Sequence, residues 1–178
     1  MHKRIDSVSL RDFTESDIGL KIKWINDPEN NKYLHYDLPL EYDKTLQWYR
    51  GKNNKTRADC VIEYDGNPVG VIGLLAIDKI NSKAEYYITL GNTSYKRRGI
   101  AKKATMLILE YAFEELALNK VYLNVDADNI AACRLYESTG FSCEGFFRKD
   151  LLRSNSLIDR KRYAILKTDW NSGWRENG

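Results

Sequence analysis

The chain passes from an apolar strand pattern into its longest helical pattern across one basic stretch, Tyr95-Lys96-Arg97-Arg98-Gly99-Ile100-Ala101-Lys102-Lys103. The N–H groups of a helix's first turn have no partners inside the helix, and the helix dipole makes that end positive. Five cations within eight positions of such an end are therefore locally unfavourable. A polyanion resolves the conflict, because phosphate oxygens accept hydrogen bonds from the free amides while the cationic side chains neutralise the charge. Gly99 lacks a Cβ and allows close backbone approach to the phosphates. The alternative is a solvated basic helix start without a ligand.

The segments on either side of this stretch alternate between strand and helix patterns. Before it, two apolar, β-branched runs are separated by Asp65-Gly66-Asn67, which is typical of a β-hairpin. The predicted strands here are residues 58–64, 68–77 and 83–90. After it come helix 99–118, strand 120–126, helix 129–139 and strands 141–149 and 158–167.

The N-terminal part adds one strand and two short helices. Residues 8–13 alternate as a strand, and residues 14–24 show helical spacing with Thr14 as N-cap. Asp27-Pro28 ends that helix, and a second is predicted for residues 41–50 after an aromatic loop over residues 33–39. The order predicts a single α/β (α+β) domain, residues 1–170, followed by a polar tail, residues 171–178. Its sheet is mixed and mostly antiparallel, with about seven strands and helices on both faces.

Composition excludes several classes of function. The chain has 178 residues, 43% hydrophobic residues and a net charge of +3, which suits one globular domain and argues against a nucleic-acid partner. No apolar run approaches membrane-spanning length, and no leader pattern stands at the N-terminus, so no membrane partner and a cytoplasmic location are expected. Three cysteines without ligand spacing and two isolated histidines predict no metal. The oligomeric state stays open, a homodimer included.

Two segments resemble motifs of a known enzyme family. Lys96-x-x-Gly99-x-Ala101 resembles the Gln/Arg-x-x-Gly-x-Gly/Ala signature of the GNAT N-acetyltransferase superfamily, with lysine in place of the usual first residue. The segment Asn129-x-x-Ala132-x-x-Leu135-Tyr136-Glu137-x-x-Gly140-Phe141 resembles the helix and turn that follow in that family. Further matches at Ala84-Glu85, at 24–29 and at Asp169-Trp170 resemble the RimJ/RimL-like branch. The resemblance covers nearly the whole chain and implies acetyl-CoA as co-substrate.

The resemblance implies a set of cofactor-binding residues around the basic stretch and the following helix. Asn129 is expected to bond the pantetheine arm, to cap its helix, or to do both. Leu90 and Ile100 are either structural or, for the backbone of Leu90, paired with the pantetheine as a mock strand. The full set is Leu90, Lys96, Arg97, Arg98, Gly99, Ile100, Ala101, Lys102 and Asn129.

Acetyl transfer from a thioester to an amine needs a proton donor for the leaving thiolate. A phenol has a pKa near 10 and stays protonated at neutral pH, and Tyr136 matches the tyrosine that often has this role in the superfamily. The alternative interpretation is that Tyr136 is a structural helix residue packed on the core. Glu85 is the leading candidate for the base, acting through water or holding a cationic amine, and its alternative is an exposed strand glutamate. Strand alternation puts Glu85 and Tyr87 on one face and Tyr86 on the other.

The sequence says less about the identity of the acceptor than about the acetyl-transfer chemistry. Candidates for lining its pocket are Tyr33, His35, Tyr36, Asp37, Trp48 and Tyr87. We expect the primary amine of a small molecule, either an amino sugar on a nucleotide carrier or a polyamine. Alternatives are a protein N-terminal acetyltransferase of the ribosomal-protein type, an antibiotic acetyltransferase and a non-catalytic coenzyme A-binding module. A nucleic-acid-binding domain is disfavoured because its basic residues would lie along a whole face among stacking aromatics.

Overall fold

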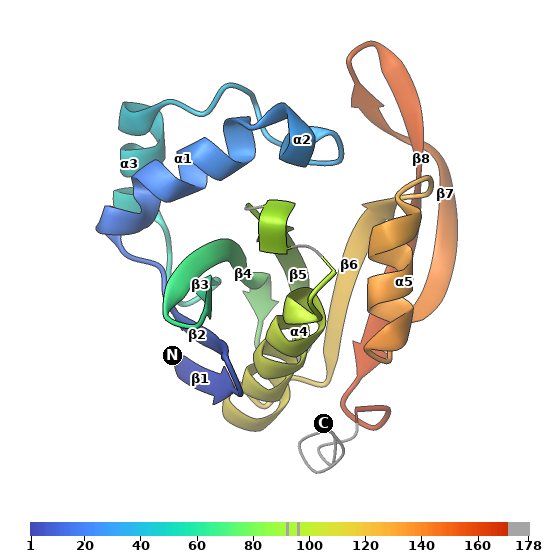
Figure 1. Ribbon diagram of the computed structural model, residues 1–178. Helices are drawn as coiled ribbons and strands as arrows, with labels where there is room; N and C mark the ends of the chain where they lie inside the picture. Colours follow the sequence, from blue (N-terminus) through green and yellow to red (C-terminus); the bar gives the residue numbers. More distant parts are fainter. Residues whose placement is uncertain (92, 96, 171–178) are drawn as a thin grey trace.

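The computed structural model describes residues 1–91, 93–95 and 97–170 as one α/β unit built on a single sheet (Figure 1). The strands are β1 (His2–Ile5), β2 (Val8–Asp12), β3 (Ala58–Tyr64), β4 (Asn67–Asp78), β5 (Lys83–Leu90), β6 (Lys120–Asp126), β7 (Ser142–Arg153) and β8 (Ser156–Leu166). The helices are α1 (Ile18–Asn26), α2 (Pro28–Asn31), α3 (Tyr42–Gly51), α4 (Ile100–Glu110) and α5 (Ile130–Ser138). Short turns of 3-10 helix span Glu15–Asp17 and Thr93–Tyr95, and a π-helical turn, Tyr111–Glu115, continues α4.

The sheet runs in the order β1-β2-β3-β4-β5-β6-β8-β7, and the pairing of β5 with β6 is its parallel contact. The other neighbours pair antiparallel. β5 and β6 pair only at Lys83–Lys120, Ala84–Val121 and Glu85–Tyr122, although both strands continue beyond these pairs. The sheet is therefore split along its middle, because the later part of β5 does not pair with β6.

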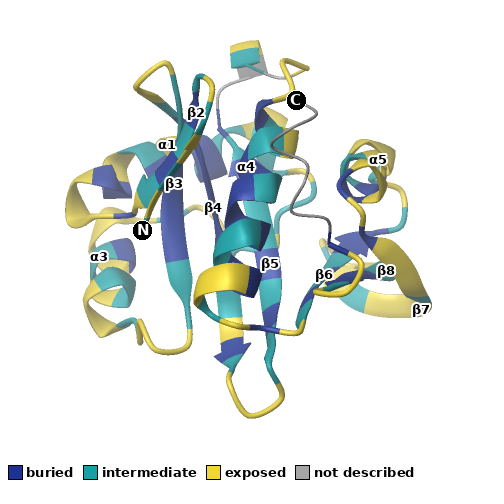
Figure 2. Cartoon of the chain, turned by 90° about the horizontal axis from the view of Figure 1, so that it is seen from below, coloured by how far each residue is buried: buried dark blue, intermediate teal, exposed yellow. Residues whose placement is uncertain are grey.

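Helices cover both faces of the sheet, as the sequence predicts. Alternation along β3 sends Ile62 into a core cluster with Leu107 and Ile108 of α4, whereas Val61 joins a second cluster with Ile18 of α1. The first cluster also includes residues of α5, and Leu46 and Trp48 of α3 pack against the second. Figure 2 shows the central strands buried beneath α4, with α3 on the other side of the sheet.

Most predicted elements are confirmed, and the bounds of β3, β5 and β6 are those expected. The sequence missed β1, where three polar residues precede Ile5; Lys3 of that strand pairs with Glu110 and Glu115, more than a hundred positions away. The helix expected over 99–118 is regular only to Glu110 and then widens into the π-helical turn. The tail, residues 171–178, lies outside the described residues.

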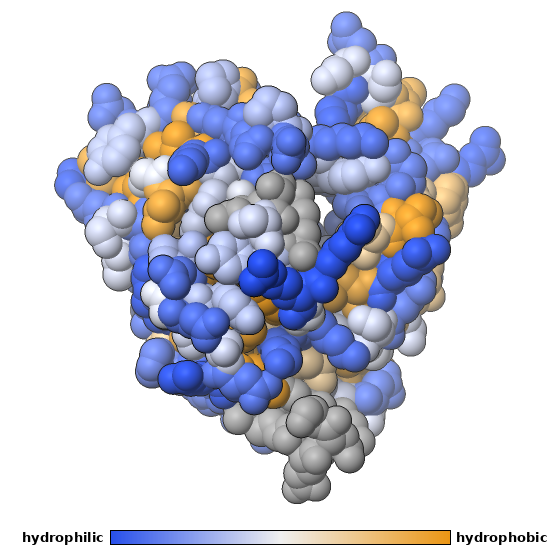
Figure 3. All heavy atoms as spheres, in the orientation of Figure 1, coloured by the Kyte–Doolittle hydropathy of each residue, from blue (hydrophilic) through white to orange (hydrophobic). Residues whose placement is uncertain are grey.

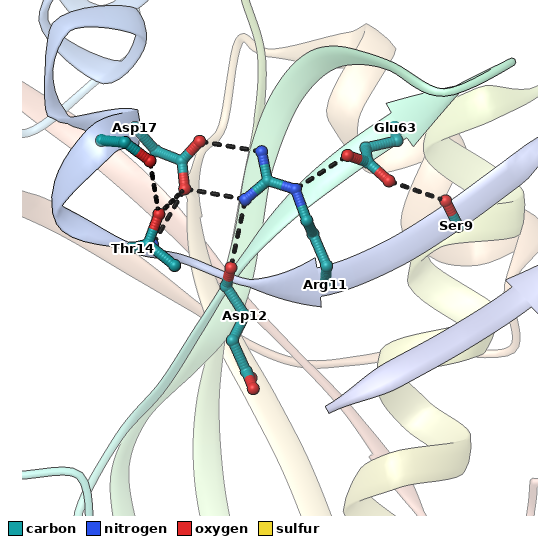
Figure 4. Close-up of polar contacts among 7 residues, drawn as sticks. Ser9, Arg11, Asp12, Thr14, Asp17 and Glu63 are labelled. Carbon is teal, nitrogen blue, oxygen red and sulfur yellow. Dashed lines mark hydrogen bonds and ion pairs between the residues drawn. The ribbon is translucent and has the colours of Figure 1, made fainter.

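Arg11 fixes the start of α1 against the sheet (Figure 4). Its guanidinium donates two hydrogen bonds of 2.8 Å to Asp17 and one of 2.7 Å to Glu63 on β3. Thr14 donates to Asp17 through its backbone N–H and its hydroxyl, which closes the helix start that the sequence predicts. Burial alone would raise the pKa of Asp17, but the hydrogen bonds from Arg11 and Thr14 outweigh it and lower that pKa. This network ties the start of α1 to β2 and β3.

Candidate active site

A cavity of about 780 Å³ occupies the split between β5 and β6. Both strands line it beyond their last pair, through Tyr86 to Leu90 on β5 and Leu123 to Asp126 on β6. The α5 residues on its wall lie on the same face of the sheet as α4, whereas Lys21 and Trp48 come from α1 and α3 on the opposite face. Figure 3 shows the molecule hollowed between the α1–α2 helices and the β7–β8 hairpin, with hydrophilic side chains gathered over the start of α4. One cavity therefore joins the two faces of the sheet.

The start of α4 presents free backbone amides. Gly99 precedes the helix with φ of 74° and Arg97 has φ of 64°, so two backbone positions close together adopt the left-handed conformation. Among the described residues no side chain caps the helix, and its first internal hydrogen bond runs from the N–H of Lys103 to the carbonyl of Gly99, 3.1 Å. The amides ahead of that bond have no partner inside the helix, which is the arrangement that binds phosphate at a helix start.

The predicted basic residues surround this helix start without forming one cluster. Arg97, Arg98 and Lys102 are exposed, and the Arg98 guanidinium stacks over the Tyr95 ring at 5.4 Å. Lys103 instead pairs with Asp6 at 2.6 Å. Ile100 is 1% exposed and packs in the core, so only its backbone is offered to a ligand. Lys96 lies outside the described residues.

Three other predicted cofactor residues, Leu90, Ala101 and Asn129, line the cavity itself. Asn129 caps α5, because its Oδ1 accepts a hydrogen bond of 3.2 Å from the N–H of Ala132. Leu90 ends β5 on the part of the strand that lacks a β6 partner. An extended chain lying in the split can therefore find unused backbone groups along β5.

Tyr136 lies on the α5 side of the cavity. It is 8% exposed, and its ring contacts those of Tyr86, Phe141 and Tyr163. Burial raises the pKa of its phenol, so the group stays protonated throughout the neutral range. In the part of the chain that the structure describes, its hydroxyl makes no hydrogen bond that would hold it away from a ligand.

Glu85 occupies the last pair of β5 with β6, where the split begins, and is half buried. The Asn124 side chain lies 3.5 Å from its carboxylate. Tyr87, on the same face, donates a hydrogen bond of 2.7 Å to Asp59, and burial raises the pKa of that phenol far above its usual range. Tyr87 is thereby committed to Asp59, whereas Glu85 faces the cavity with one long contact.

The remaining predicted acceptor residues Tyr33, His35, Tyr36 and Trp48 all line this cavity. His35 is also structural, since its Nε2 lies 3.1 Å from Asp126, which Arg153 of the β7–β8 hairpin binds as well. Burial lowers the pKa of His35 despite the hydrogen bond to Asp126. Asp37 instead lines a second cavity of about 340 Å³, which shares Lys21, Tyr36 and Trp48 with the first.

Sequence reasoning missed Lys21, Arg57, Asn124 and Asp126, which also line the cavity. Lys21 carried a signal: it falls between Ile18 and Ile25 on the apolar stripe of α1, where a charged residue breaks the pattern. Asn124 and Asp126 carried none, because nothing local marks the point at which β6 leaves β5.

The described ranges contain neither a metal-binding cluster nor a membrane-spanning helix. No three His, Cys, Asp or Glu side chains gather there as a metal site. None of the helices described is long and apolar enough to cross a bilayer. All three cysteines are unpaired.

Comparison with known proteins places the chain among acetyltransferases. Residues 7–142 match the family model described as acetyltransferase (GNAT) domain. The chain is 28% identical to the uncharacterized N-acetyltransferase YnaD of Bacillus subtilis, over 96% of this chain and 100% of the relative. It is 29% identical to the spermidine N(1)-acetyltransferase of Escherichia coli, over 90% and 87% of the two chains. The crystal structure of spermidine N-acetyltransferase from Vibrio cholerae in complex with CoA and spermine superposes with a TM-score of 0.84 at 25% identity, over 92% and 97%.

Proposed function

This chain belongs to the acetyltransferase (GNAT) family and is an acetyl-CoA-dependent N-acetyltransferase, and we propose that it acetylates a primary amine of a small molecule. The observation that carries the proposal is the cavity through the split between β5 and β6. Its walls hold a protonated phenol on one face of the sheet and a carboxylate on the other, so donor and acceptor can meet between them.

The residues fit coenzyme A on chemical grounds. The free amides before Lys103 and the exposed Arg97, Arg98 and Lys102 suit its phosphates. The unpaired edge of β5 up to Leu90 suits the amides of its pantetheine arm. When bound, the co-substrate supplies the activated acetyl group as a thioester.

We assign the general acid to Tyr136. A thiol has a pKa of about 8.5, so a leaving thiolate accepts a proton from a phenol that burial keeps protonated. We assign Glu85 to the amine, which it either holds as a cation or deprotonates through water. The two residues are on opposite faces of the sheet, as transfer between two ligands requires.

Two acceptor classes supply such an amine. A polyamine is supported by the relatives whose names specify spermidine. An amino sugar on a nucleotide carrier also supplies an amine and carries phosphates in addition. Transfer to a protein N-terminus is the remaining alternative, and it needs room for a chain beyond the cavity. The three unpaired cysteines fit the reducing cytoplasm that we expect.

The test is release of free thiol from acetyl-CoA in the presence of single acceptors, with the acetylated product identified by mass. Polyamines, amino sugars, nucleotide-linked amino sugars and short peptides with free N-termini form the panel. We expect turnover with one class of small amine. Turnover with peptides alone would replace the small-molecule acceptor by a protein, and failure of the folded chain to bind acetyl-CoA would remove the assignment.

A further inference from the structure

Lys21 is a buried cation without an ionic partner. It is 7% exposed, and within the described part of the chain its ammonium forms no ion pair or hydrogen bond. Its Nζ lies 3.6 Å from the centroid of the Trp48 ring. The side chain lines both the 780 Å³ cavity and the 340 Å³ cavity, so it stands where the two meet. A buried charge is normally paired, and its free energy is unfavourable until it is.

The carboxylate that acts on Lys21 is already used by other residues. Asp59 accepts two hydrogen bonds of 2.7 Å from Arg57 and one of 2.7 Å from Tyr87. The Nζ of Lys52 is also close to this carboxylate, at 3.5 Å. Three cations therefore share one carboxylate in this corner, and Arg57 and Lys52 themselves oppose the charge on Lys21. Lys21, Arg57 and Lys52 together carry more positive charge than Asp59 neutralises.

Carboxylates lie elsewhere on the walls. Glu85 stands at the split, and Glu29 of α2 also lines the large cavity. Asp126 is bound by His35 and Arg153. The second cavity is lined by Asp37, which is exposed, and by Glu41, which is paired with Lys44 at 2.7 Å. A negative group therefore stands where the amine reacts, and a positive group stands on the α1–α3 side of the same space.

From this arrangement we infer that the acceptor carries an anionic group, a carboxylate or a phosphate, and that Lys21 binds it beside Trp48. The inference rests on the proposed function and narrows its substrate class. Binding supplies the missing partner of the ammonium, which is 7% exposed, and a charge-assisted hydrogen bond is strong where the groups are buried. A polyamine places further cations next to Lys21 instead, and like charges repel. The chain accordingly differs in acceptor from its spermidine-acetylating relatives.

The experiment compares acceptors that share an aminoalkyl chain and differ in the group at its other end. One pair is 4-aminobutanoate and 1,4-diaminobutane, and a second is O-phosphoethanolamine and ethanolamine; the two pairs distinguish carboxylate from phosphate. We expect kcat/KM to favour the anionic member by roughly ten- to a hundredfold, the size expected for a hydrogen bond to a charged group. Lys21→Met should abolish that preference by raising KM for the anionic amine, and Lys21→Arg should restore part of it. Lys23→Met is the matched control, since Lys23 is exposed on the same helix.

A second readout covers acceptors that turn over too slowly. The Lys21 ammonium is followed by NMR after reductive methylation, with the Lys21→Arg variant to assign its signal. Inorganic phosphate or acetate, each added separately to the acetyl-CoA complex, should raise the pKa of Lys21, whereas the signal of the exposed Lys23 should not respond. A preference for the diamine that survives Lys21→Met, or a Lys21 signal indifferent to both anions, overturns the inference. Loss of acetyl-CoA binding itself would instead count against the proposed function.

Discussion

The hydroxyl of Tyr136 is free to act on a ligand because its ring, not its oxygen, holds the residue in place. Three neighbouring rings pack around it, and no described residue hydrogen-bonds the hydroxyl. Tyr136→Phe should therefore leave the melting temperature nearly unchanged. We expect kcat to fall by about a hundred- to ten-thousandfold with acetyl-CoA affinity retained, since general acid catalysis contributes that much.

Pre-steady-state thiol release by the folded variant measures this effect on the chemical step. Acetyl-CoA titration calorimetry serves as the control on binding. Unchanged chemistry in Tyr136→Phe would assign the proton to water or to another donor, and the family assignment would stand.

Replacing the buried Lys21 is expected to change the free energy of unfolding, and the change should depend on pH. Burial lowers its pKa from 10.5 to about 8, so between these values the unfolded chain binds more protons and the free energy of unfolding rises with pH. Below pH 8 the whole penalty is present, about 3 kcal/mol for such a shift. Lys21→Met removes it and loses the contact with Trp48, about 1–2 kcal/mol. We expect net stabilisation of about 1–2 kcal/mol at pH 7 that disappears toward pH 10, measured by urea unfolding at both values.

A destabilised Lys21→Met variant at pH 7 would mean that the ammonium has a structural partner in solution. Lys23→Met is again the comparison, since its exposed side chain should have little effect at either pH.

At the level of elements, the start of α4 depends on one left-handed residue. Gly99 has φ of 74° with no atom within 4 Å of a Cβ built on it, so a larger side chain meets a backbone conflict and no clash. Gly99→Val should cost about 1–3 kcal/mol of stability or shift the loop, because a β-branched residue avoids this region. Acetyl-CoA should then bind more weakly, measured by calorimetry on the folded variant.

Gly51→Val provides the control for Gly99→Val. Gly51 ends α3, has no positive φ and has open space around it. Equal acetyl-CoA affinities for the two folded variants would refute phosphate binding at this loop.

Elements with strong local patterns were predictable, and contacts between distant elements were not. β5 and β6 follow from apolar runs, and the α5 start follows from Asn129, whose side chain caps the helix. The polar strand β1 depends on ion pairs with residues more than a hundred positions away, so its own residues do not predict a strand. The predicted pocket residues line one cavity except Asp37, which lines the second, and the charge pattern depends on Lys21 and on which carboxylates other residues already use.

At the scale of the molecule, positive charge is dispersed. The net charge is +3, and several basic residues outside the α4 start pair with acids, for example Lys120 with Glu144 and Arg160 with Asp150. Nucleic-acid affinity comes largely from many phosphate contacts acting together. We therefore expect no retention of DNA or RNA in a mobility-shift assay at physiological salt, with a basic DNA-binding protein as positive control. Tight binding that weakens steeply with salt would contradict this expectation.

The split in the sheet also has a kinetic consequence. Acetyl-CoA is assigned to the α4–α5 face and the amine to the α1–α3 face, so neither ligand has to leave before the other arrives. We therefore expect both to occupy the enzyme at once and the acetyl group to pass directly between them, without a modified protein. Double-reciprocal plots at several fixed amine concentrations should intersect, and a dead-end analogue of either ligand should leave the other's site accessible. Parallel lines, together with an acetylated protein detected by mass spectrometry, would indicate a ping-pong mechanism, in which the first product leaves before the amine binds.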